Sequence, residues 1–243
     1  MKSQIKCDFQ LPAETLFLNE ISTSTLSKTN NQIFDSNGFL LLKNFIDVEN
    51  YMDTNIPKER GCITYSSSKE ILNHDPIELQ VNGSLSRYNY PIYNNLSNEI
   101  KLKIEKIIGK KLYKTYYYDR YYFPGQELKV HVDRPSCEIS VTVHLGSNFK
   151  SPWLFGIKTP VKFSSKDEEI IVHDLGDEVY FDLNVGDAIL YKGMQRPHWR
   201  NPMPGRKRNF LRKIFKRQEI YYHQIFFHYV LCDGMYSEYA FDI

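Results

Sequence analysis

From Lys111 onward the chain alternates apolar and polar residues in short segments, and turn residues such as Pro124 and Gly125 separate them. The segments are KLYKTYYYDRYYF, ELKVHVD, EISVTVHL, PWLFGIKTPVKF, EEIIVHDL, DEVYFDL, DAILYKG and EIYYHQIFFHYV. Strands of this length, at this spacing and joined by Gly, Pro, Asn and Asp turns, are typical of a sandwich or barrel. We therefore predict a barrel core over about residues 111–232.

The first 110 residues follow a helical pattern in part. In LSNEIKLKIEKIIGKK the isoleucines share one helical face, which predicts a helix with Ser97 as N-cap and Gly109 as its end. FDSNGFLLLKNFID predicts an Asn-Gly turn, a short apolar strand and a helix from about Val48. The expectation is a mainly β protein with flanking N-terminal helices, in which about residues 1–110 form a helical support.

Composition fits this class. Of 243 residues, 14% are aromatic, with 18 Tyr and 15 Phe, which favours sheet. Without an internal repeat or a low-complexity linker, we expect a single domain over residues 1–243.

The cysteines (Cys7, Cys62, Cys137 and Cys232) have no short pair spacing, which argues against a disulfide framework. The apolar runs are shorter than the roughly 20 residues of a membrane span, and no signal-peptide core is present, so a cytoplasmic location is expected.

Charge is concentrated in one segment. Residues 206–217, RKRNFLRKIFKR, carry seven cations and no acid, although the formal net charge of the chain is only +2. As a helix the segment would be basic and amphipathic. Two interpretations stay open: a solvated insertion over about residues 205–218, or a patch for an anionic substrate, a nucleic acid or a membrane surface.

The stretch KVHVDRPSCEIS contains the first candidate chemistry. Side chains alternate across a strand, so His131 and Asp133 leave on one face and can share a ligand. A hydrogen-bonded His–Asp pair would give the same spacing. A second histidine from a distant strand, His198, would complete the two-histidine, one-carboxylate triad of non-haem Fe(II) oxygenases, which leaves three coordination positions open.

The other histidines compete with His198 for that role. His144 is expected in the barrel interior or behind the ligands, and His223 and His228 lie on the last strand with opposite facing. His173 is expected to be exposed and His74 to lie in a turn.

These residues carry a family resemblance. YFPGQELKVHVD resembles the Tyr-x-Pro-Gly, five residues, His-x-Asp pattern of the 2-oxoglutarate and Fe(II)-dependent dioxygenases, in particular their prolyl-4-hydroxylase-like branch. GDAILYKG with His198 and Pro202 is similar to that family's hairpin and distal histidine. GFLLLKNFID resembles a strand and helix shared with the phytanoyl-hydroxylase-like enzymes. The resemblance covers roughly residues 35–230.

The resemblance implies a double-stranded β-helix, a jelly-roll or cupin-like barrel, with iron bound by His131, Asp133 and His198. It implies 2-oxoglutarate as cosubstrate, dioxygen as oxidant and ascorbate as an auxiliary reductant. The expected reaction is hydroxylation of an unactivated C–H bond in a small or peptidyl substrate, with release of succinate and CO2. The cations favour an acidic substrate.

The far carboxylate of 2-oxoglutarate needs a cation and hydrogen-bond donors. Tyr122 matches the family's tyrosine. The family also has a basic residue about ten positions after the distal histidine, and this residue corresponds to Arg208 or Lys207 here. If the basic segment is an insertion, the equivalent position lies near the uncharged Gln224, and Arg200 or Arg120 would take over the role. A different class also stays open: a non-catalytic jelly-roll protein that binds an anionic ligand or nucleic acid beside a vestigial metal site.

Overall fold

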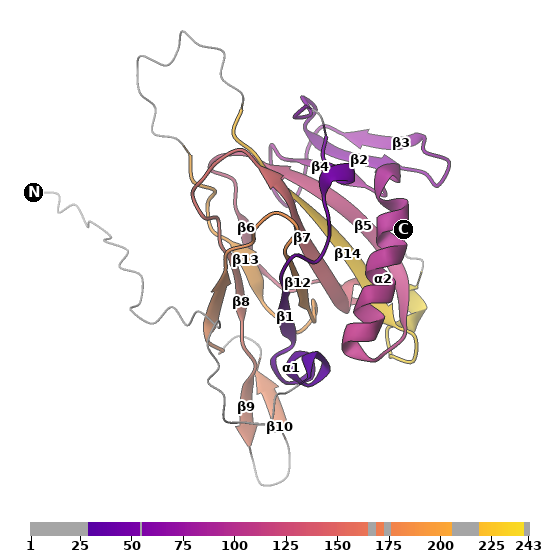
Figure 1. Ribbon diagram of the computed structural model, residues 1–243, viewed down its shortest axis with the longest axis vertical. Coiled ribbons are helices and arrows are strands. Elements are labelled where there is room, and N and C mark those ends of the chain that lie inside the picture. Colours follow the sequence, from indigo (N-terminus) through magenta and orange to yellow (C-terminus); the bar gives the residue numbers. More distant parts are fainter. Residues whose placement is uncertain (1–28, 54, 165–168, 173–175, 206–218, 241–243) are drawn as a thin grey trace, which may run out of the picture.

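The computed structural model describes residues 29–53, 55–164, 169–172, 176–205 and 219–240, which form a mainly β structure with two α-helices (Figure 1). Several sequence predictions fall outside these residues: the basic insertion, Arg208 and Lys207, and His173.

Both α-helices end at a glycine, as predicted for α2, whereas α1 was not predicted from the sequence. α1 (Asn30–Asn37) begins with a capping box at Thr29 and stops at Gly38, whose φ is 75°. α2 (Asn94–Ile108) stops at Gly109, with φ 68°. The predicted N-cap Ser97 is wrong, because α2 begins one turn earlier, directly after the 3-10 turn η2 (Pro91–Tyr93).

The N-terminal region is less helical than predicted. The helix expected from about Val48 is only a 3-10 turn, η1 (Glu49–Tyr51). The same region supplies four strands: β1 (Phe39–Leu42), β2 (Gly61–Tyr65), β3 (Ile71–Asp75) and β4 (Leu85–Tyr88). Strands of four or five residues are too short for a clear alternation, and β1 pairs with a distant strand, β12 (Ala188–Tyr191).

Every strand segment predicted after Lys111 contains a strand. The bounds are β5 (Leu112–Tyr122), β6 (Leu128–His131), β7 (Ile139–Ser147), β8 (Phe155–Lys158), β9 (Val161–Ser164), β10 (Glu169–Val172), β11 (Glu178–Phe181), β12 (Ala188–Tyr191) and β14 (Tyr222–Leu231). β13 (His198–Arg200) is an additional strand. His198 begins this additional strand, whereas the GDAILYKG segment forms β12.

The strands form two large sheets and a hairpin. The eight-stranded sheet has the order β1-β12-β7-β14-β5-β4-β2-β3, and the four-stranded sheet has the order β11-β8-β13-β6. All neighbours in both sheets are antiparallel, except β2 and β4. β9 and β10 pair with each other.

The eight-stranded sheet packs on both faces. On one face α2 buries Ile100 and Ile104 against Ile225 and Phe227 of β14 (Figure 1). The other face meets the four-stranded sheet, where Phe226 of β14 belongs to the same buried cluster as residues such as Leu128 of β6. This second interior also contains buried polar side chains: Arg120, Ser140, Thr142, His144, Arg200, Gln224 and His228. Burying that many polar groups is costly without partners or a ligand, so this interior is where a functional site is to be sought.

Candidate metal centre

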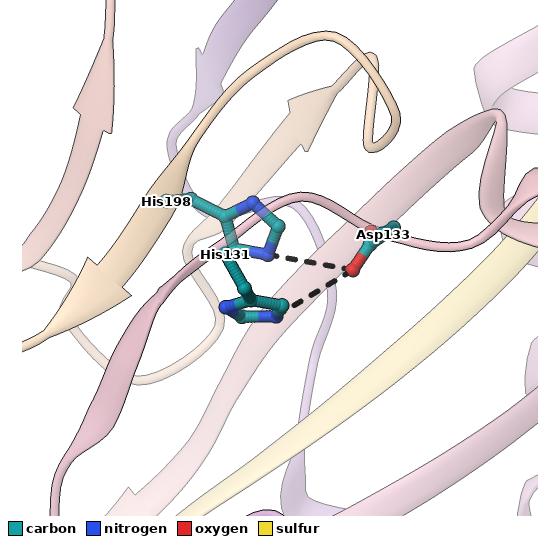
Figure 2. A group of neighbouring side chains, drawn as sticks. All are labelled: His131, Asp133 and His198. Carbon is teal, nitrogen blue, oxygen red and sulfur yellow. Dashed lines mark ion pairs between the residues drawn. The ribbon is translucent and has the colours of Figure 1, made fainter. Parts of the chain in front are cut away.

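The strand register brings the two candidate histidines together. β6 and β13 are antiparallel neighbours, with His131 opposite His198, and the two imidazole centroids are 4.3 Å apart. Asp133 follows β6 by two residues and turns its carboxylate toward both rings (Figure 2). Its Oδ1 lies 3.7 Å from Nε2 of His131 and 3.6 Å from Nε2 of His198.

Both rings are held so that Nε2 is available. Nδ1 of His131 is 2.8 Å from the Lys129 carbonyl oxygen, and Nδ1 of His198 is 2.9 Å from the Arg196 carbonyl oxygen. A carbonyl only accepts, so each Nδ1 carries the proton and each Nε2 keeps its lone pair. Burial lowers the pKa of His198 to about 4, which keeps that ring neutral at neutral pH.

The three donors fit one divalent metal ion. Their ligand atoms all lie within 4.8 Å of one another. Imidazole nitrogens and carboxylate oxygens bind such ions at about 2.1 Å, which places two adjacent donors about 3.0 to 3.4 Å apart. The observed separations of 3.6 and 3.7 Å therefore require a contraction of only about half an ångström. Two imidazoles and one carboxylate on a single face are the donor set of non-haem ferrous centres.

The second oxygen of Asp133 is held by neighbouring groups. Ser140 Oγ donates to Asp133 Oδ2 at 2.7 Å, and the Asp133 backbone amide donates to the Gly193 carbonyl at 3.0 Å. A Cβ atom on Gly193 would lie 2.3 Å from Asp133 Oδ2, so the backbone approaches the carboxylate more closely than any other residue would allow.

A side chain from the loop after β3 also reaches the centre. Gln80 Nε2 lies 3.2 Å from Nε2 of His131, and Gln80 Oε1 accepts from Nη1 of Arg120 at 2.8 Å. Arg120 is fully buried and forms an ion pair with Glu78 at 3.0 Å. The anion that a buried guanidinium needs is therefore supplied to Arg120 by Glu78.

Arg200, predicted from the sequence as a cosubstrate residue, lies two residues beyond His198 on β13 and is 1% exposed. It donates to the Trp153 carbonyl and, through Nη2, to the Tyr222 hydroxyl at 3.0 Å. No ion pair among the described residues involves Arg200, and its buried Nε has no hydrogen-bond partner. Buried guanidinium groups are usually paired with an anion, so Arg200 is a candidate anion-binding residue.

Other buried atoms without partners lie around Arg200. His144 stacks on Tyr222 with ring centroids 4.1 Å apart, and its Nε2 has no hydrogen-bond partner. Burial lowers the pKa of His144 to about 4, and the charge of Arg200 contributes to the shift. Gln224 Oε1, on the residue opposite His144, is likewise without a partner. Together these atoms form a polar compartment, defined here as His144, Arg200, Tyr222 and Gln224.

Tyr122, predicted as a cosubstrate residue, is fully buried in the same interior. Its hydroxyl accepts from Nη1 of Arg120 at 3.4 Å, and its ring packs against Trp153 with centroids 4.9 Å apart. Tyr122 therefore lies on the Arg120 side of the interior, and a direct role toward a cosubstrate stays a prediction.

The remaining described histidines lie in different parts of the structure. His144 lies in the interior, as predicted. His223 is bonded to Asp119 at 2.7 Å on the other face of the sheet, and His228 lies 3.0 Å from Ser140 Oγ. His74 is exposed on β3, which is a strand and not the predicted turn.

The sequence analysis did not identify the residues that surround the candidate ligands. These are Gln80, Glu78, Ser140 and Gly193. Gly193 and Ser140 belong to segments that were recognised as strands or hairpins, but neither spacing nor charge distinguishes them from ordinary strand residues. Gln80 and Glu78 lie in a loop whose path depends on the fold.

Comparisons with known proteins were made for sequence and structure. No family model and no curated protein sequence matches the chain. Solved structures do: a Pseudomonas putida prolyl-4-hydroxylase (9% identity, 82% of this chain and 96% of that chain, TM-score 0.47) and HygX from Streptomyces hygroscopicus with nickel and 2-oxoglutarate bound (14%, 84% and 87%, 0.49). A third is SnoK, a non-haem α-ketoglutarate-dependent carbocyclase from nogalamycin biosynthesis (10%, 86% and 88%, 0.49).

These structures include members of the superfamily that the sequence motifs resemble. With identities of 9–14% and TM-scores below 0.5, the likeness assigns neither an activity nor a ligand to this chain. A functional assignment therefore depends on the residues of the centre. Among the described helices, none has the length and hydropathy of a membrane span.

Proposed function

We propose that the protein is a 2-oxoglutarate- and Fe(II)-dependent dioxygenase that hydroxylates an unactivated C–H bond of a small or peptidyl substrate, with release of succinate and CO2. The observation that carries the proposal is the convergence of Nε2 of His131, Nε2 of His198 and Oδ1 of Asp133, with both Nδ1 atoms engaged by backbone carbonyls. Such an arrangement binds a divalent ion on one side only.

The strand order supports a double-stranded β-helix. Strands β5 to β8 alternate between the large and the small sheet, and so do β11 to β14. β5, β7, β12 and β14 are adjacent in the large sheet, and β6, β8, β11 and β13 form the small one. This is the connectivity of an eight-stranded jelly roll with two Greek keys. In this proposal residues 111–232 form the barrel core of a single domain, and the metal centre lies between the sheets.

His131, Asp133 and His198 would hold ferrous iron, leaving about three coordination positions for a bidentate 2-oxoacid and for dioxygen. Bound iron would supply the activation of dioxygen, coupled to oxidative decarboxylation of 2-oxoglutarate and oxidation of a substrate C–H bond. The chain's own contribution is to fix the donors. The Lys129 and Arg196 carbonyls set the tautomers, and Ser140 orients the carboxylate.

The polar compartment would receive the far carboxylate of 2-oxoglutarate. Arg200 shares a strand face with His198, because the two residues are two positions apart on β13. Both side chains also lie close to one ring, since Phe155 is 5.6 Å from the Arg200 guanidinium and 5.8 Å from the His198 imidazole. The Tyr222 hydroxyl, already bonded to Arg200, would donate a second hydrogen bond.

The substrate is proposed to be acidic, on the strength of exposed cations beside the metal centre. Lys129 is exposed on β6, and Arg134 is exposed, with its guanidinium 4.7 Å from the ring of Tyr116. Either cation would attract an anionic substrate to the centre.

The proposal is tested by anaerobic titration of the metal-free protein with Fe(II), followed by measurement of succinate formed from 2-oxoglutarate in air with ascorbate. The expected result is one ferrous ion per chain and succinate formation even without the substrate, because these enzymes turn over slowly on the cosubstrate alone. Stoichiometric Fe(II) binding without succinate would identify a non-catalytic metal-binding barrel and reject the dioxygenase. Absence of Fe(II) binding would reject the metal centre as well.

A further inference from the structure

We propose that Ser140 and His228 are positioning residues that force Asp133 to bind the metal through Oδ1 alone. The inference rests on the proposed metal centre and concerns residues that the dioxygenase chemistry does not itself require. It would explain how this chain keeps a third coordination position open.

The hydrogen bonds form a directed chain. Ser140 Oγ is 2.7 Å from Asp133 Oδ2 and 3.0 Å from Nδ1 of His228. A hydroxyl has one proton, and both the Asp133 carboxylate at 2.7 Å and the Cys137 carbonyl at 3.3 Å can only accept it. The shorter, charge-assisted contact directs that proton to Asp133. His228 Nδ1 must then donate to Ser140. Nε2 of His228 is buried without a partner, which agrees with a neutral ring that carries its proton on Nδ1.

This chain of hydrogen bonds gives the two oxygens of Asp133 different contacts. Oδ2 is engaged by Ser140, whereas Oδ1 lies 3.7 and 3.6 Å from the two Nε2 atoms (Figure 2). A carboxylate that bound through both oxygens would take a further position on a six-coordinate ion. Only about two positions would then remain, too few for a chelating 2-oxoacid together with dioxygen.

Packing prevents the carboxylate from rotating away from Ser140. The Cβ position of Gly193 would lie 2.3 Å from Asp133 Oδ2 and 2.7 Å from Ser140 Oγ, so the Gly193 backbone closes that side. Ser140 is itself fully buried on β7. The serine hydroxyl therefore has a fixed position relative to the carboxylate.

The same residues could be interpreted as a second metal site, because ligand atoms of Asp133, Cys137 and His228 lie within 4.8 Å of one another. The Ser140 hydroxyl already bridges Asp133 and His228, and the Cys137 thiol lies 3.1 Å from the Tyr116 hydroxyl. A second ion would have to displace these hydrogen bonds. The geometry favours the hydrogen-bond chain.

The test uses the full chain loaded with Mn(II), an ion that accepts the same oxygen and nitrogen ligands and reports its bound water through proton relaxation. Ser140→Ala should weaken Mn(II) binding by about 10- to 100-fold and should remove about one exchangeable water, because Oδ2 becomes free to bind. Thr142→Val is the matched control, since it removes a buried hydroxyl two residues along the same strand face without a bond to Asp133. It should leave both measurements unchanged.

Two further variants distinguish positioning from general packing. Ser140→Thr retains the hydroxyl and should recover most of the affinity and the water number. His228→Leu removes the donor behind Ser140 and should give a smaller change in the same direction. The inference would be overturned if Ser140→Ala left both the Mn(II) affinity and the water number unchanged. It would also be overturned if Thr142→Val changed them as much as Ser140→Ala does. A second Mn(II) ion lost in Cys137→Ser would also overturn it.

Failure of this inference is separable from failure of the proposed function. If the native chain binds one metal ion and forms succinate while Ser140→Ala matches it in affinity and water number, only the positioning role is rejected. If the native chain binds no metal, the proposed centre is rejected first.

Discussion

Two clusters in this protein bring histidine and aspartate together, one on the eight-stranded sheet and one on the four-stranded sheet. In the closed cluster, defined as Asp53, Arg87, Tyr93, Asp119 and His223, Nε2 of His223 is 2.7 Å from Asp119 Oδ2. Arg87 and Tyr93 add further hydrogen bonds to the same carboxylate. In the metal centre the corresponding separations are 3.6 and 3.7 Å, and both histidines direct Nε2 toward one oxygen.

The difference shows that proximity of histidine and aspartate does not by itself indicate a metal site. In the closed cluster a cation is already present: burial opposes ionisation of Asp119, but Arg87 and His223 outweigh it and lower the pKa of Asp119 to about 2. The candidate metal centre has donors spaced for an ion, and among the described residues no arginine or lysine forms an ion pair with Asp133. The aspartate of the closed cluster is thus neutralised by an arginine of the protein, whereas Asp133 is left to pair with a metal ion, as a candidate ligand would be.

The largest expected effect is on metal binding. Replacing His198 or Asp133 with Ala should weaken Fe(II) binding by about a thousandfold, since each ligand contributes a large share of the binding free energy. His223→Ala should leave Fe(II) binding nearly unchanged. Isothermal titration under anaerobic conditions measures both. Equal losses in His223→Ala and His198→Ala would show that the comparison between the clusters is wrong.

The second effect is on stability. Asp119→Asn should lower the free energy of unfolding by about 3 kcal/mol, because it leaves the buried Arg87 with Asp53 as its remaining acidic partner. Asp133→Asn should cost less than about 1 kcal/mol in the metal-free protein, where no cation depends on it. Urea unfolding of the two variants provides the measurement. A larger loss for Asp133→Asn would contradict the assignment of structural and ligand roles.

The sequence predicted the β segments better than their connections. Aromatic and β-branched alternation marked the strands after Lys111, because strands such as β5, β7 and β14 pack against an apolar core. β13 has three residues and a register shift, so no periodicity reveals it. The helix expected at Val48 became a 3-10 turn, since local propensity there yields to packing of the neighbouring strands against the sheet.

The sequence indicated the three candidate ligands that the fold brings together, but not the residues around them. His131 and Asp133 are close in sequence, and the motif indicated His198. Gln80 and Ser140 contact these residues only because loops and strands far apart in the chain meet, which spacing does not encode. The choice among basic residues depended on burial, a property of the fold: Arg120 is matched by Glu78, whereas Arg200 has no acidic partner in the described ion pairs.

The third effect concerns pH. Burial lowers the pKa of His144 to about 4, whereas an unfolded histidine has a pKa near 6.5. The unfolded chain therefore binds more protons between these values, and stability should fall as the pH drops from about 6.5 toward 4, by up to about 3 kcal/mol for this group. His144→Leu should reduce that loss in urea unfolding at pH 7 and pH 4.5. The closed cluster should lose its contribution only at lower pH, as Asp119 is protonated. An unchanged pH dependence in His144→Leu would contradict this account.

The fourth effect separates the two buried arginines. Arg200→Leu should raise the dissociation constant of 2-oxoglutarate about 10- to 100-fold, since it removes a charge-assisted hydrogen bond, and should cost little stability. Arg120→Leu should instead lower stability, because Glu78 loses its partner. Equilibrium binding with the metal-loaded protein and urea unfolding test the pair. Unchanged cosubstrate binding in Arg200→Leu would reject the polar compartment as its site.

The smallest effect is expected at Gln80. Its hydrogen bond to His131 occupies a histidine nitrogen of the metal centre, just as a hydrogen bond occupies the His223 nitrogen in the closed cluster. Its amide lies 3.2 Å from Nε2 of His131, the atom that a metal ion needs, so ion binding must first break this hydrogen bond. A net hydrogen bond is worth about 1 kcal/mol, and Gln80→Ala should therefore tighten metal binding about fivefold. Gln126→Ala, which alters an amide that bonds only to Phe123 and Asn82 backbone groups, is the matched control. Weaker binding in Gln80→Ala would mean that Gln80 supports the bound ion, and that the centre is open at a different side from the one inferred.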